Sequence, residues 1–201
     1  MNEVQELRGT TAEIISLFAE VYQPPTREFW HYLVSGEFVD NINNRATYSK
    51  WGVRIPQSLE ELQNLYIQTL SNQVETAAYP VESLYKQWTE DRTCTLPFSK
   101  STGYLLGDSA LHIRHILKEF EIEIPAEYAS TPDHLTILLE LLAYFIDNSS
   151  EEFVQQFIDD HFDWLEQFYK KLIEATGDKN VFYLQMTGLL MEILMDLRRE
   201  K

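Results

Sequence analysis

Two groups of residues in the sequence have the types that metal binding or catalysis needs. In the first, Asp108, His112 and His115 are spaced so that a helix would place them on one face. Two imidazoles and a carboxylate are metal ligands, but one helix face alone does not complete a metal site. The single cysteine, Cys94, also excludes a cysteine-rich site. We therefore favour a solvent-exposed polar stripe, and the alternative is a helical metal-binding enzyme that uses these three residues.

The second group is the neighbouring pair Asp133 and His134. Successive helical residues point about 100° apart, so Asp133 would not orient the His134 ring as a catalytic triad requires. The sequence contains no nucleophile elbow, no P-loop and no dinucleotide-binding fingerprint. We expect no catalytic residue, no bound metal and no cofactor.

The stretch from Leu135 to Ile146 follows this pair, and Thr136 and Glu140 are its only strongly polar residues. A helix that is apolar nearly all round belongs in the middle of a helical core. The run is too short to span a bilayer, which needs roughly 20 apolar residues. We therefore predict a buried central helix, in which the Glu140 carboxylate would also be buried and would need a partner.

The residues before this run resemble a helix start. Thr131 has a hydroxyl suited to capping, and Pro132 suits the first turn, where its missing N–H is not needed. The predicted first turn therefore contains Asp133 and His134. There the helix dipole would favour a charged aspartate, and we expect the pair to serve binding more than stability.

The remaining sequence predicts further helices and no strands. Capping boxes are expected at Thr10 and at Ser58, Thr26 is expected to begin a helix, and Gly36 and Gly177 are expected to end helices. A polar loop is predicted over 89–102, a helix over 104–120 and a break in the helix that follows 151 near 160–163.

We predict an all-α, compact single helical domain of two halves. The N-terminal half covers about 1–120 and the C-terminal half covers 132–201. They are joined by a hinge near 121–131, which contains Pro125.

The formal net charge is −16, and no lysine or arginine lies between Lys118 and Lys170. Such a charge argues against nucleic acid and against an anionic membrane surface as partners. It has two open interpretations: a solvated surface that keeps the protein soluble, or a field that attracts a basic partner. The polar, acidic residues 1–8 do not resemble a signal peptide, and no stretch resembles a membrane span. We expect a cytoplasmic protein.

Three ordered motifs resemble the family of redox-enzyme maturation chaperones, the TorD, DmsD and NarJ group. The motifs are Tyr79-Pro80-x-x-Ser83-Leu84-Tyr85, Gly103-Tyr104-Leu105-Leu106-Gly107-Asp108, and Pro132-Asp133-His134-Leu135 with His161-Phe162-x-Trp164-Leu165 downstream. Their order and spacing resemble the family from about residue 79 to 170.

The resemblance implies an all-α cytoplasmic chaperone that is not an enzyme. Such a protein binds the catalytic subunit of a molybdenum or tungsten oxidoreductase, often through its twin-arginine leader or N-terminal segment, during cofactor insertion and before export or assembly. It also implies a monomer or a dimer swapped through the hinge. A generic helical adaptor for another protein is the remaining alternative. The predicted client-binding residues are Tyr79, Ser83, Leu84, Tyr85, Trp88, Gly107, Asp108, Pro132, Asp133, His134 and Leu135.

Overall fold

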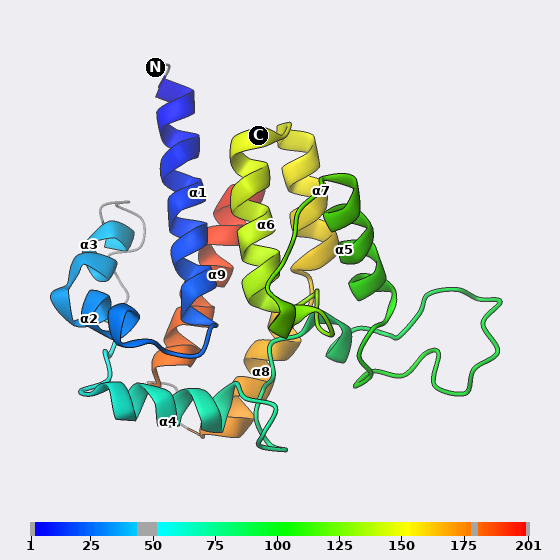
Figure 1. The fold of residues 1–201 in the computed structure, drawn as a ribbon, viewed down its shortest axis with the longest axis horizontal. Coiled ribbons are helices and arrows are strands. Elements are labelled where there is room, and N and C mark those ends of the chain that lie inside the picture. The colour runs from blue at the N-terminus through cyan, green and yellow to red at the C-terminus, as the bar shows by residue number, and fades with distance from the viewer. Residues whose placement is uncertain (1–2, 44–51, 178–180, 200–201) are drawn as a thin grey trace.

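The computed structural model describes residues 3–43, 52–177 and 181–199, and within these ranges it contains helices and no β-strand (Figure 1). This confirms the all-α prediction. The α-helices are α1 (Glu3–Val21), α2 (Arg27–Ser35), α3 (Glu37–Asn43), α4 (Leu59–Thr69), α5 (Asp108–Glu119), α6 (Leu135–Asn148), α7 (Glu151–His161), α8 (Leu165–Thr176) and α9 (Phe182–Arg199). Two short 3₁₀ turns are η1 (Glu82–Leu84) and η2 (Ala126–Tyr128).

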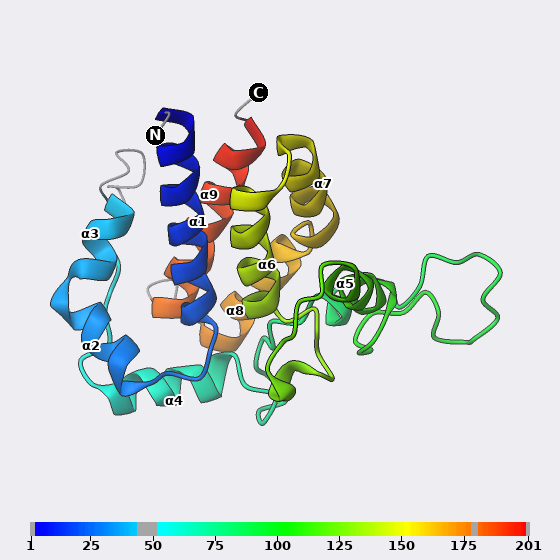
Figure 2. The same cartoon turned by 45° about the horizontal axis from the view of Figure 1, so that its top comes forward.

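Helix α6 lies at the centre of the fold, as its apolar sequence predicts. It packs most extensively along α1, with α7 on its other side (Figures 1 and 2). Among its buried residues, Leu135, Leu138, Leu142 and Phe145 have no exposed surface at all. Helices α2 and α3 lie outside α1, and α5 lies beyond α7 (Figure 2). The apolar surface buried along α6 therefore contributes to the stability of the bundle.

The start of α6 differs from the prediction. The helix begins at Leu135, and its N-cap is His134, whose ring nitrogen Nδ1 accepts a hydrogen bond from the Thr136 backbone N–H at 3.2 Å. The preceding residues form a turn in which the His134 N–H donates to the Thr131 carbonyl at 3.0 Å. Asp133 and His134 therefore precede the first helical turn and are not part of it.

A pairing with a distant segment explains this difference. The Glu82 N–H donates to the Asp133 carbonyl at 3.1 Å, and the Leu135 N–H donates to the Pro80 carbonyl at 2.8 Å. Val81 and His134 form an isolated antiparallel bridge. The backbone before Leu135 is thus extended so that it can pair with residues 80–82.

Several other helix ends agree with the predictions. The side chains of Thr26 and Ser58 cap α2 and α4, and the left-handed residues Gly36 and Gly177 end α2 and α8. The predicted break near 160–163 is also present, because α7 ends at His161.

Three further expectations are wrong. Helix α1 begins at Glu3, so Thr10 lies inside it and does not cap it. Helix α5 begins at Asp108 and not near Tyr104. Glu140 is exposed, because it faces the space between α6 and α1 and not the centre of the core.

Residues 89–106 project from the body, and we call them the arm (Figures 1 and 2). The predicted loop 89–102 within it has neither helix nor strand. Backbone hydrogen bonds close the root of the arm: the N–H groups of Trp88 and Thr89 donate to the carbonyls of Ser101 and Ser99, each at 3.0 Å. The arm therefore has a fixed root and a projecting tip.

Candidate functional site

Most of the predicted binding residues lie in a buried junction that we call the clamp, formed by residues 79–85 and 131–135. Asp133 is fully buried there, and its Oδ2 accepts a hydrogen bond from the Ser83 backbone N–H at 2.7 Å. Burial raises the pKa of Asp133, while hydrogen bonds from Ser83 oppose that rise. Pro132, Leu135 and Ser83 are buried as well. The carboxyl group of Asp133 thus ties the two segments of the clamp together.

His134 is buried beside Asp133 and contacts two tyrosine rings. Its ring centroid lies 5.6 Å from that of Tyr79 and 5.0 Å from that of Tyr128. Because Nδ1 accepts the bond from Thr136, the proton of the neutral ring is on Nε2. Burial lowers the pKa of His134 to about 3, so the ring is neutral at physiological pH. His134 is therefore a cap and a packing residue.

A second network links the clamp to α7 and α5. The buried Glu82 carboxylate forms an ion pair with Lys86 at 2.9 Å and contacts His161 Nδ1 at 2.9 Å. His161 Nε2 lies 3.0 Å from Nδ1 of His112, whose ring is exposed. Burial raises the pKa of Glu82, and His161 and Lys86 counteract this effect. Glu82, His161 and His112 form a continuous hydrogen-bonded row from the core to the surface.

The row includes His112, one member of the predicted stripe of Asp108, His112 and His115. His112 pairs with His161, and His115 lies 4.0 Å from Glu119. No group of three or more potential ligands with metal-binding geometry occurs in the part of the chain that the structure describes. Asp108, His112 and His115 are each exposed on α5, and they have separate contacts.

Gly107 and Asp108 hold the root of the arm. A Cβ at Gly107 would lie 2.6 Å from the Trp88 carbonyl oxygen, so only glycine fits there without a backbone shift. The Asp108 carboxylate accepts hydrogen bonds from the Thr89 hydroxyl and from the Glu90 N–H, both at 2.9 Å. These residues position the arm and leave its tip free.

The remaining predicted residues lie between the clamp and the arm and are half-buried. Tyr85 stacks on Trp164 with ring centroids 5.1 Å apart, and Leu84 lies beside it in the chain. Trp88 packs against Phe98 at 5.1 Å and donates its indole N–H to the Leu105 carbonyl at 3.2 Å. Each side chain retains some accessible surface, so these residues can both support the arm and contact a ligand.

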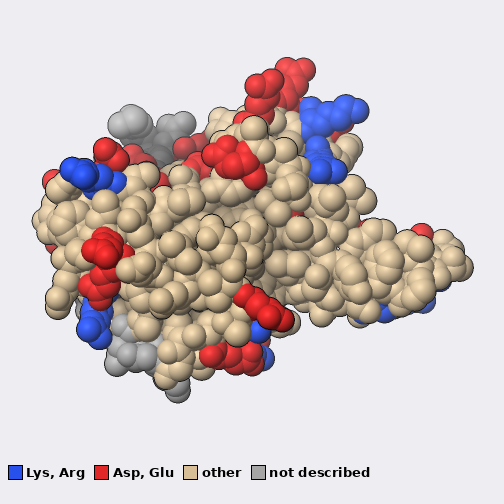
Figure 3. All heavy atoms as spheres, turned by 60° about the horizontal axis from the view of Figure 1, so that its bottom comes forward, with Lys and Arg blue, Asp and Glu red and all other residues tan. Residues whose placement is uncertain are grey.

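The arm and the start of α5 expose large apolar side chains that the sequence analysis did not include among the client-binding residues. They are Leu96, Tyr104, Leu105, Leu106 and Leu111, which are between 36% and 53% exposed. In Figure 3 the arm projects to the right, and the face that it joins is dominated by uncharged atoms, with most of the visible charges near its edges. The sequence indicated an exposed apolar surface here, because Leu96, Leu105 and Leu106 are large apolar residues in a segment with many polar ones.

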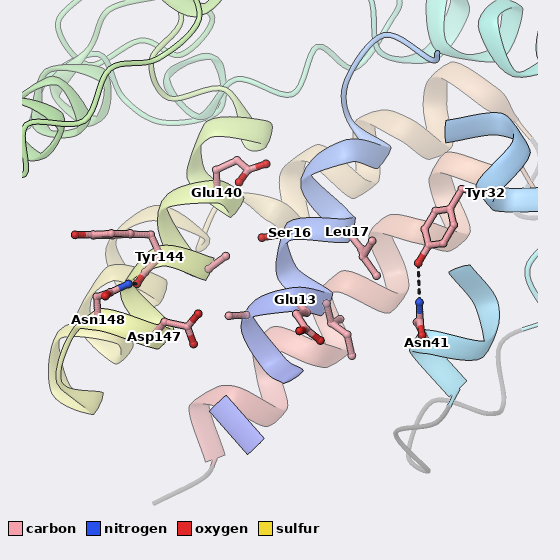
Figure 4. A pocket seen from close by; sticks show the side chains of 12 residues that line it. Glu13, Ser16, Leu17, Tyr32, Asn41, Glu140, Tyr144, Asp147 and Asn148 are labelled. Carbon is pink, nitrogen blue, oxygen red and sulfur yellow. Dashed lines mark hydrogen bonds between the residues drawn. The ribbon is translucent and has the colours of Figure 1, made fainter. Parts of the chain in front are cut away.

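A separate acidic groove lies between α1 and α6, with α2 and α3 along its far side (Figure 4). Its volume is about 630 Å³, and its carboxylates are those of Glu13, Glu140 and Asp147. At the far side the Asn41 amide donates to the Tyr32 hydroxyl at 2.7 Å. Partial burial, followed by the charge of Glu20, raises the pKa of Glu140. The groove therefore brings three carboxylates together.

Comparison with known proteins gives two matches. The sequence profile of the family described as "Nitrate reductase delta subunit" matches residues 37–175. The chain is also 26% identical over 203 residues to the chaperone protein TorD of Shewanella pealeana, covering 94% of this chain and 87% of that protein. Among the described residues, no helix has the length and apolar character needed to cross a membrane.

Proposed function

Because the chain belongs to the nitrate reductase delta subunit family, which is the TorD/NarJ family of molybdoenzyme maturation chaperones, we propose that its arm binds the leader of a molybdoenzyme catalytic subunit. The family is the one that the sequence motifs predict. Membership of a chaperone family also agrees with the prediction that the chain is not an enzyme. The proposal concerns the leader, its place on the structure and the stage at which it binds.

The exposed apolar side chains of the arm are the observation that carries this proposal. Leu96, Leu105 and Leu106 keep part of their surface outside the core, although covering that surface would stabilise a complex by about 25 cal/mol per Å² before ordering costs. Leu106 also adopts a positive φ of 59°, a conformation that disfavours side chains other than glycine. An apolar leader segment would cover these side chains and the accessible edges of Leu84, Tyr85 and Trp88.

The charge of the chain supports the same partner. Paired arginines would be attracted by the interval between Lys118 and Lys170, which contains no basic residue. This attraction acts over a Debye length of about 8 Å at physiological ionic strength, so salt should slow association. The apolar contacts on the arm are not screened, and they would retain part of the affinity at high salt.

The clamp has a supporting role in this proposal. Asp133 and His134 are buried, so they would act by fixing the segments from which the arm projects. We also propose that binding occurs in the cytoplasm, before cofactor insertion is complete, and that the 121–131 segment acts as a hinge. The oligomeric state, monomer or hinge-swapped dimer, belongs to the same proposal.

The test uses a labelled twin-arginine leader peptide and a twin-lysine version of it. Binding is measured by fluorescence anisotropy at low and high salt, with the wild type and with a Leu96→Ser, Leu105→Ser double variant. The matched control is Ile67→Ser on α4, which removes an exposed apolar side chain far along the chain from the arm. We expect the double variant to lose about tenfold in affinity, as for loss of about 1.4 kcal/mol, and the control to lose none.

Affinity capture from native extract provides the second arm of the test. We expect the wild type to retain a molybdoenzyme catalytic subunit and the arm variant to retain less of it. If the peptide binds both proteins equally well at every salt concentration, the arm is not the leader site. If neither the peptide nor a molybdoenzyme subunit binds the wild type, the proposed client class is wrong.

A further inference from the structure

Three exposed aromatic rings form a second apolar surface away from the arm. Phe120 follows α5, Tyr144 lies on α6 and Phe153 lies on α7, and these rings are 36% to 41% exposed. The Phe120 centroid lies 6.3 Å from that of Tyr144 and 6.0 Å from that of Phe153. We call these three residues the aromatic ridge.

The ridge has a rigid base. The buried ring of Phe145 lies 5.1 Å from Phe120, 5.6 Å from Tyr144 and 4.8 Å from Phe153, measured between centroids. One core side chain therefore contacts all three exposed rings. Aromatic surface held in this way loses little conformational freedom when a ligand covers it.

A hollow adjoins each side of the ridge. Tyr144 lines the acidic groove between α1 and α6, where it is labelled in Figure 4. Phe120 and Phe153 line a smaller pocket of about 310 Å³ between α5 and α7, which we call the His112 pocket. A chain segment lying across the ridge would thus find a recess for side chains on either side.

Both hollows are negatively charged. The groove contains the carboxylates of Glu13, Glu140 and Asp147, and the His112 pocket contains those of Glu119 and Asp160. Among the described residues that line the two hollows, none is a lysine or an arginine. The apolar ridge is therefore bordered by negative charge on both sides.

The histidine row also reaches the smaller pocket. His161 Nδ1 lies 2.9 Å from the Glu82 carboxylate and His161 Nε2 lies 3.0 Å from His112 Nδ1, so the row holds the His112 ring at the pocket wall. Burial, and then the neighbouring His161, lower the pKa of His112. The His112 ring is thus fixed in place, and its neutral form is favoured there.

We propose that the aromatic ridge and its two hollows form a second docking site, for a partner segment in which large apolar side chains are bordered by lysine or arginine. The apolar side chains would cover the three rings, and the basic groups would reach the carboxylates of the two hollows. Solubility explains acidic side chains on a surface, but it does not explain adjacent exposed rings between them. The inference does not depend on the arm being the leader site.

The native histidines provide a direct test by NMR. The probe is a short amphipathic peptide of leucine and lysine, and a leucine–glutamate peptide of the same pattern is the control. His112 and His115 line the pocket, His31 lies on α2, and His134 is buried. We expect the lysine peptide to shift the ring signals of His112 and His115 and to leave those of His31 and His134 unchanged.

Variants on each side of the ridge make the test specific. Phe153→Ser and Asp147→Asn should each weaken lysine-peptide binding about fivefold, the effect of an interface residue worth about 1 kcal/mol. The matched controls are Ile67→Ser and Glu75→Gln, which alter an exposed apolar and an exposed acidic residue elsewhere. An unchanged His134 signal shows that a variant is folded.

Two results would overturn the inference. One is a lysine peptide that binds Phe153→Ser and Asp147→Asn as tightly as the wild type, and the other is equal binding of the glutamate peptide. Adding the labelled leader peptide separates this site from the arm. We expect both peptides to bind at once, and displacement of the leader by the lysine peptide would show that the two sites are not independent.

Discussion

The clamp and the arm both contain residues of the three sequence motifs, but their side chains have opposite environments. Asp133 and His134 in the clamp are buried, and each side chain accepts a hydrogen bond from a backbone N–H group. Leu105 and Leu106 in the arm are exposed, although they are apolar. Polar groups inside and apolar groups outside are both unfavourable unless something compensates for them.

The compensation differs between the two regions. In the clamp it is internal, because the Ser83 and Thr136 backbone N–H groups occupy acceptors of Asp133 and His134. In the arm no such internal compensation covers the exposed leucines, and we propose that a leader does so. The three motifs thus combine buried residues that shape the candidate site with exposed residues that we propose contact its ligand.

The largest effect on stability is expected from Asp133→Ala. The Ser83 N–H would be left without its acceptor in a buried position, which costs about 1–3 kcal/mol. Urea unfolding followed by circular dichroism measures the loss. Leader affinity per folded molecule should stay close to that of the wild type.

Asp108→Ala is the comparison variant, because Asp108 is exposed and holds only the root of the arm. Its effect on the free energy of unfolding should be smaller. Should Asp133→Ala instead retain its stability and lose leader affinity, the sequence-based prediction that this residue serves binding would be correct.

A pH-dependent effect is expected from His134. Its pKa is about 3 in the folded protein and about 6.5 in an unfolded chain, so the unfolded state takes up the proton first. The contribution of neutral His134 to the free energy of unfolding is fully present above about pH 6.5. It is lost as the pH falls toward the folded pKa, by about 1.4 kcal/mol per pH unit.

Unfolding free energies of the wild type and of His134→Gln, measured across this range, test the expectation. The wild type should lose stability more steeply with falling pH than the variant does. Equal slopes would mean that His134 is accessible to protons in the folded state, which would blur the distinction between clamp and arm.

A loss of stability is also expected from Gly107→Ala, at the boundary between the two regions. The added methyl group would meet the Trp88 carbonyl oxygen at 2.6 Å, and overpacking of this kind costs about 1–3 kcal/mol. Thermal unfolding should show the loss. Gly52→Ala is the control, because no atom lies within 4 Å of its added Cβ, and a similar loss in both variants would contradict the steric explanation.

The smallest effect on stability is expected from changing the arm itself. Leu96→Ser with Leu105→Ser should alter the free energy of unfolding by about 0.5 kcal/mol or less, as is usual for exposed positions. The same double variant should show the largest loss of leader binding. A large loss of stability on urea unfolding would indicate that these leucines belong to the packed body.

Features set by neighbouring residues could be predicted from the sequence. Thr26 and Ser58 accept hydrogen bonds from N–H groups three residues later, and Gly36 and Gly177 adopt left-handed conformations at helix ends. The position of α6 at the centre follows from its own apolar residues. These features depend on local chemistry, which one sequence contains in full.

Features that depend on distant segments were not predictable in this way. The start of α6 was misplaced because its preceding residues pair with Pro80 and Glu82, and a local pattern does not show that pairing. The contact between His112 and His161 joins two helices in the same way. The motifs located the region of the candidate site, but they did not show that Asp133 faces inward or that Leu105 faces solvent.

The bridge between Val81 and His134 brings together the two ends of a stretch that contains the arm, α5 and residues 121–131. In polymer terms this stretch is a closed loop, and doubling the length of such a loop costs only about 0.6 kcal/mol of closure entropy. Insertions or deletions at the tip of the arm should therefore be tolerated while the bonds at its root remain. The length of the arm can thus change at little cost in stability, while the helical body stays the same.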